Sequence, residues 1–152
     1  MTAETLPAAL AEIRKDFLEL DEPERLQLLL EFSRELPAMP SEYADHPERT
    51  ERVAECQSPV FIVVEVGGDS PTAQSPVAMH AAAPAEAPTT RGFASILAQG
   101  ITGLTAEQVL AIPADYPQSL GLTRAVSPLR IAGMTGMLMR AKRQVQARLD
   151  AA

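Results

Sequence analysis

The chain has 152 residues, an apolar fraction of 46% and a net charge of −7, which predict a single globular domain over residues 1–152. The acidic balance argues against nucleic acid as the main partner, because phosphate contacts require a basic surface. The longest strongly apolar run, residues 60–64, is too short to cross a membrane, and no apolar signal-peptide segment precedes it. We therefore expect a cytoplasmic protein without a membrane segment.

Two amphipathic helices are predicted at the N-terminus. Residues 5–20 have apolar side chains at helical spacing. Asp21 begins a second helix, which has Pro23 in its first turn, where a missing N–H costs little. Pro37 and Pro40 end that helix. We interpret the pair as an antiparallel helical hairpin.

The middle of the chain predicts a loop followed by a small antiparallel sheet. Residues 37–55 are polar, charged and interrupted by proline, which indicates a surface loop. Residues 60–64 form a short apolar run with four β-branched members, typical of a buried strand. A turn over residues 67–71 and alternation over residues 77–83 predict a second strand.

Helices return after the sheet. One is predicted from about Thr90, with Gly100 beyond its end. Thr105 and Gln108 have the spacing of a capping box, which predicts a helix that reaches residues 110–112.

The last predicted helix begins at Ser127 or near Gly133 and continues to the C-terminus. Residues 124–152 carry six basic residues and one acidic residue, a local charge of +5. We interpret this charge as a solvated helix face, the alternative being a surface that docks on an acidic protein. The elements together predict an α+β fold with a helical hairpin, a small antiparallel sheet and C-terminal helices.

Cys56 is the chain's only cysteine. It excludes an internal disulfide and a cysteine-rich zinc site, and we expect no metal and no cofactor. A free thiol is compatible with a reducing compartment. Cys56 lies between a polar loop and an apolar strand, where partial exposure and loop N–H groups can support a thiolate. The competing interpretation is that Cys56 packs as a small apolar side chain.

Four stretches of the sequence carry distinctive motifs. In chain order they are residues 30–37, a helix ending in Leu-Pro; Cys56-Gln57-Ser58, followed by an apolar strand; Arg91-Gly92-Phe93, a basic-Gly-apolar helix start; and residues 120–134, in which Ser127-Pro128-Leu129-Arg130 forms a Ser/Thr-Pro-x-Arg signature before the last helix. In this order they resemble the SufE family, in which the second stretch carries the active cysteine.

The resemblance implies a SufE/IscU-like fold and a sulfur-transfer protein rather than a stand-alone enzyme. Cys56 would take persulfide sulfur from a PLP-dependent, SufS-like cysteine desulfurase, stimulate that enzyme and pass the sulfur to iron–sulfur scaffold proteins. The chemistry would follow thiol–disulfide exchange. A monomer or weak dimer and a mobile segment over residues 50–58 are expected.

The resemblance also suggests supporting residues. Arg130 would fix a loop carbonyl or stabilise a sulfur anion, and Gln57 and Ser58 would shape the loop. Glu86, where relatives often have Asp, and Arg91 are assigned to the partner-facing rim, although helix solubility explains Arg91 equally well.

Glu55 departs from the pattern, because many relatives have Gly beside the cysteine. Its negative charge should disfavour the Cys56 thiolate.

Three other functions stay open. An IscU-type cluster scaffold needs about four ligands, which one cysteine cannot provide in a monomer. A cysteine hydrolase needs a histidine near the thiol, and His80 is the candidate base, while His46 receives no role. A helical adaptor with an inert, buried cysteine needs neither.

Overall fold

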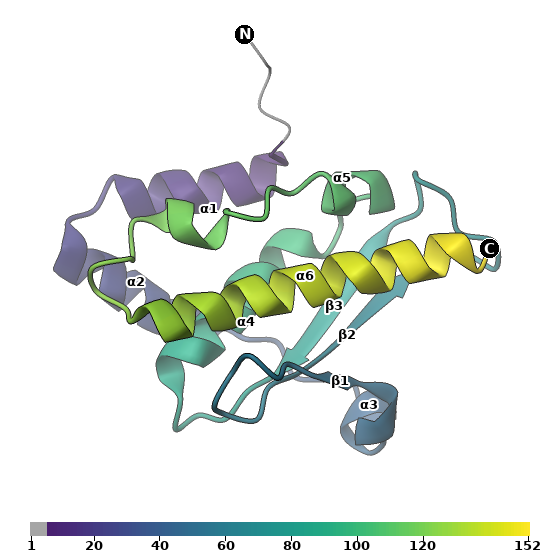
Figure 1. The fold of residues 1–152 in the computed structure, drawn as a ribbon, viewed down its shortest axis with the longest axis horizontal. Helices are drawn as coiled ribbons and strands as arrows, with labels where there is room; N and C mark the ends of the chain where they lie inside the picture. Colours follow the sequence, from purple (N-terminus) through teal and green to yellow (C-terminus); the bar gives the residue numbers. More distant parts are fainter. Residues whose placement is uncertain (1–5) are drawn as a thin grey trace, which may run out of the picture.

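The computed structural model describes residues 6–152 and shows a three-stranded sheet covered by helices (Figure 1). The fold has the predicted α+β class. Residue 5, the first of the predicted N-terminal helix, lies outside the described residues. In chain order the elements are α1 (Ala8–Leu18), α2 (Glu22–Arg34), α3 (Ser41–Ala44), η1 (Pro47–Arg49), β1 (Glu51–Arg52), β2 (Phe61–Val66), β3 (Val77–Ala82), α4 (Pro88–Ile101), α5 (Ala106–Leu110), η2 (Pro117–Leu120) and α6 (Pro128–Asp150).

The sheet is antiparallel in the order β1-β2-β3. Its inner face carries the pairs Ile62–Ala81 and Val64–Met79, which are buried beneath α4 and α6. Successive side chains of a strand point to opposite faces, so Glu65 and its cross-strand partner Ala78 lie on the other face, where both are partly exposed. Tyr43 of α3 donates a hydrogen bond to Glu65 Oε2 at 2.7 Å and so fixes α3 against that face.

Helix α4 forms the centre of the helical layer and packs against α1, α2 and α6. The prediction that Gly100 follows this helix was wrong, since α4 continues to Ile101. A Cβ at Gly100 would lie 2.3 Å from Leu10 Cδ2, so the missing side chain allows α1 to pack directly on α4. The glycine therefore marks a helix contact rather than a helix end.

The predicted loop over residues 37–55 is only partly a loop, because α3, η1 and β1 lie within it. These elements are too short for periodicity to reveal, and β1 exists only through its pairing with β2.

Capping signals were more reliable guides. Thr105 and Gln108 form the predicted capping box of α5, and Ser127 caps α6, which makes the earlier of the two predicted starts correct. Within residues 6–152, no helix has the length and apolar character that crossing a bilayer requires.

Candidate functional site

Cys56 lies at the tip of a tight loop between β1 and β2. The Val53 N–H donates to the Val60 carbonyl at 2.9 Å and closes the base of the loop, where both residues are fully buried. Within the loop, the Cys56 N–H donates to the Val53 carbonyl at 3.1 Å. A short connection anchored by two buried valines thus carries the thiol.

The Cys56 side chain points inward and rests on α6 with 7% of its surface exposed. A Cβ at Gly133 would lie 2.9 Å from Cys56 Sγ, which shows that the sulfur occupies the space left by the missing side chain. Burial raises the pKa of the thiol to about 11; the Glu55 charge adds to that rise and Arg140 opposes it. In this position the thiol is therefore protonated at neutral pH.

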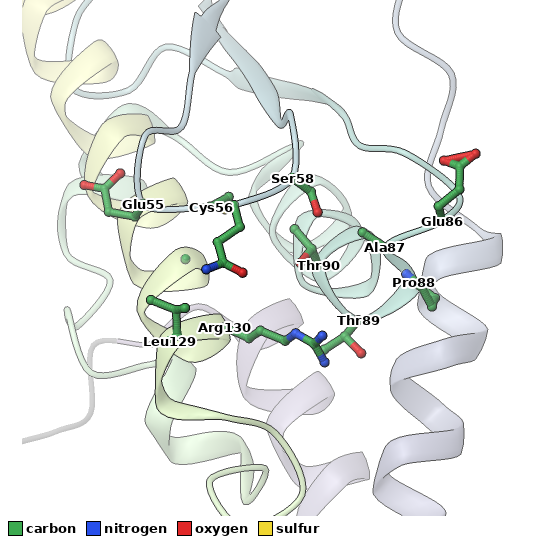
Figure 2. A pocket seen from close by; sticks show the side chains of 12 residues that line it. Glu55, Cys56, Ser58, Glu86, Ala87, Pro88, Thr89, Thr90, Leu129 and Arg130 are labelled. Atoms are coloured by element: carbon green, nitrogen blue, oxygen red, sulfur yellow. The ribbon is translucent and has the colours of Figure 1, made fainter.

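A cavity of about 320 Å³ opens beside Cys56 (Figure 2). The β1–β2 loop, the start of α4 and the start of α6 enclose it. The lining includes four of the five supporting residues predicted from the sequence, namely Gln57, Ser58, Glu86 and Arg130. Segments separated by up to 78 positions in the chain thus meet around one thiol.

The rim of this cavity carries unpaired charge. Within residues 6–152, the side chains of Arg130 and Glu86 have no hydrogen bond or ion pair, and both are exposed. Arg130 reaches toward Thr89 at the start of α4 (Figure 2). Ala87 provides no side-chain cap for α4. Free N–H groups of a first helical turn favour negative charge, so this side of the cavity is favourable for an anion.

Arg91 does not line the cavity. Its Nε donates to the Ser33 carbonyl at 2.8 Å and its Nη1 donates to the Ala83 carbonyl at 2.6 Å. These bonds tie the end of α2 and the segment after β3 to α4. In this arrangement Arg91 stabilises the fold beneath the site.

The two histidines interact elsewhere. His80 Nε2 lies 2.8 Å from Glu65 Oε1 on the half-exposed face of the sheet, and His46 Nδ1 lies 3.2 Å from Glu48 Oε2. Neither lines the cavity beside Cys56, so the geometry offers no base of the kind that a cysteine hydrolase uses. Across the described part of the chain, no group of three or more His, Cys, Asp or Glu side chains could hold a metal ion.

Sequence reasoning missed the residues of α6 that hold the loop. Arg140 bonds to Glu51 and Glu55, while Gly133 and Gly136 leave room for the loop side chains. A signal existed, since an acidic N-terminal region and a basic C-terminal helix were both evident. Charge alone did not identify which residues pair.

Comparisons with known proteins identify the family and the fold. Residues 11–145 match the model of the SufE family, described as the Fe-S metabolism associated domain. A SufE-like protein of Mycobacterium tuberculosis is 49% identical over 142 residues, which cover 93% of this chain and 94% of the relative. One from Rhizobium meliloti is 31% identical over 145 residues, which cover 94% and 99%.

A solved structure also has this fold. The solution structure of a hypothetical protein from Thermus thermophilus aligns with a TM-score of 0.80 at 32% identity, covering 95% of this chain and 98% of the other. The chain therefore belongs to the SufE family, whose domain is associated with Fe-S metabolism.

Proposed function

We propose that this protein accepts sulfur on Cys56 from the persulfide of a SufS-like cysteine desulfurase and delivers it to iron–sulfur scaffold proteins in the cytoplasm. The observation that carries the proposal is the position of the chain's only thiol. It lies at the tip of a short loop and borders a cavity whose rim holds the unpaired Arg130 and the uncapped start of α4.

The transfer is a displacement at sulfur. The Cys56 thiolate attacks the outer sulfur of the donor's Cys–S–SH group. A new S–S bond forms at Cys56 as the donor's S–S bond breaks, and the donor cysteine leaves as a thiolate. The proton on the outer sulfur stays with it, so the products are a Cys56 persulfide and a free donor thiolate. The step needs no external oxidant or reductant.

The inward position of Cys56 suits a resting carrier. A protonated, buried thiol is slow to oxidise, because oxidation requires thiolate character and exposure. Attack on another protein's sulfur requires the loop tip to turn outward, where burial no longer raises the thiol pKa. Leu129 lies beside the cavity with 52% of its surface exposed and offers the partner an apolar contact next to the thiol.

Intact-mass measurement tests the proposal. We expect one added sulfur atom after incubation with a desulfurase and free cysteine, and none for Cys56→Ser, because serine cannot form a persulfide. Ser70→Ala changes an exposed residue of the β2–β3 turn, away from the cavity, and should still acquire sulfur. A wild-type protein that gains no sulfur, or a Cys56→Ser variant that stimulates the desulfurase normally, would contradict the proposal and favour an adaptor with an inert thiol.

A further inference from the structure

We propose that Glu55 and Arg140 form a latch that holds Cys56 in its inward position and so sets how often the thiol is exposed. The two are positioning residues, because they act on the reaction through Cys56. The consequence for sulfur transfer rests on the proposed function. The latch itself is a property of the folded chain.

Arg140 ties the loop to α6 at two points. Its Nε and Nη2 donate to Glu55 Oε1 at 3.1 and 2.8 Å, and its Nη1 donates to Glu51 Oε2 at 2.7 Å. The guanidinium thus joins β1 to the residue before the cysteine. A planar fork that contacts two carboxylates loses little side-chain freedom for each bond it forms.

Glu55 and Cys56 occupy neighbouring gaps in the same helix. A Cβ at Gly136 would lie 2.7 Å from Glu55 Cδ, just as a Cβ at Gly133 would meet Cys56 Sγ. Residues three apart lie on one face of a helix. The adjacent side chains of the loop therefore fit side by side against α6, and the contact that holds Glu55 also holds the backbone that carries Cys56.

Opening the latch does not unfold β1. Glu51 also pairs with Arg143 and accepts a hydrogen bond from Gln144 Nε2 at 2.8 Å. Gln144 in turn accepts from the Val64 N–H of β2 at 2.8 Å. The Glu55 side chain is 44% exposed, so its bond to Arg140 is partly screened and can break within the folded state. The loop tip can therefore open while the sheet stays attached to α6.

The latch and the charge of Arg140 predict opposite changes in the rate at which the Cys56 thiol reacts when Arg140 is replaced. Arg140 lowers the Cys56 pKa, so removing its charge should make the thiolate scarcer and slow any reaction of the thiol. Removing the latch should expose the thiol and accelerate the same reaction. Arg140→Gln therefore separates the two effects.

The test measures the rate at which iodoacetamide, an uncharged reagent, alkylates Cys56 in the complete chain near neutral pH. Cys56 is the only thiol, so the mass change reports on it alone. We expect Arg140→Gln to react about threefold to fivefold faster than wild type, the upper part of the range that a partly exposed ion pair supports. Arg143→Gln is the matched control, because it removes a charge one turn away that contacts Glu51 but not Glu55, and its rate should stay unchanged.

An unchanged or slower rate in Arg140→Gln overturns the latch, as does an equal acceleration in Arg143→Gln. If circular dichroism shows that Arg140→Gln does not fold, Arg140→Lys decides the question. Lysine keeps the charge but cannot contact both carboxylates in the same way, so we expect a rise of about twofold, and no rise overturns the proposal.

These results are separate from sulfur transfer. Alkylation needs no desulfurase, so a failed latch leaves the carrier function intact. A Cys56 that never accepts sulfur defeats the carrier function while the alkylation rates still judge the latch.

Discussion

Replacing Gly133 by Ala should expel the Cys56 sulfur from its inward position. The added Cβ would lie 2.9 Å from Sγ, about 1 Å inside normal contact. The next two nearest atoms also belong to Cys56, namely its Cα and Cβ at 3.9 Å. The closest steric conflict is thus with one residue on a loop.

The magnitude follows from two opposing terms. Overpacking of this kind costs about 1–3 kcal/mol, whereas Ala in place of Gly within a helix returns about 0.5–1 kcal/mol. When Cys56 is in the outward position, the overpacking cost is absent and the gain in helix stability from Ala remains. We therefore expect the inward position to weaken by about 1.4 kcal/mol or more, which is about a tenfold gain in exposure. The free energy of unfolding should change by less than about 1 kcal/mol.

The assay is again alkylation of Cys56 by iodoacetamide, combined with urea unfolding. Gly133→Ala should react about tenfold faster than wild type with nearly unchanged stability. Ala132→Gly is the matched control, because it alters helix propensity at the adjacent, exposed position without approaching the thiol. If Gly133→Ala loses several kcal/mol of stability and reacts no faster, α6 has yielded instead of the loop, and the reasoning is refuted.

Two further predictions concern Arg91 and pH. Arg91→Ala should lower the free energy of unfolding by about 2 kcal/mol, because it removes two hydrogen bonds to carbonyl groups. Arg34→Ala, on the exposed side of α2, should leave the free energy of unfolding unchanged. Sulfur transfer by folded Arg91→Ala at the wild-type rate would exclude a role of Arg91 in the chemistry, and a large loss of transfer would establish one. Because the folded protein raises the Cys56 pKa from 9.0 to about 11, the thiol's contribution to stability should be lost as pH rises through that interval. The difference in unfolding free energy between wild type and Cys56→Ala should shift accordingly, and a pH-independent difference would show that the thiol pKa is not raised.

Local patterns were sufficient for most elements of the fold. The periodicity of α1 and α2, the β-branched run of β2 and the caps Thr105 and Ser127 are properties of short stretches, so they could be identified without knowing the tertiary structure. The prediction of a loop over residues 37–55 missed β1, because β1 has only two residues and depends on β2 for its hydrogen bonds. The prediction that Gly100 follows the helix was wrong, because a glycine after a helix and a glycine at a contact between helices cannot be distinguished in the sequence.

Some features of the site could be predicted from the sequence, and others depend on the tertiary structure. By itself, the sequence determined that any thiol chemistry must use Cys56, and its resemblance to the family suggested Gln57, Ser58, Glu86, Arg91 and Arg130 as supporting residues. Only the tertiary structure decided that the sulfur faces Gly133, that Arg91 lies away from the cavity, and that Glu55 meets Arg140. The last pair is separated by 85 positions. Such contacts depend on how α6 packs across the sheet, and no local pattern of charge or spacing records that packing.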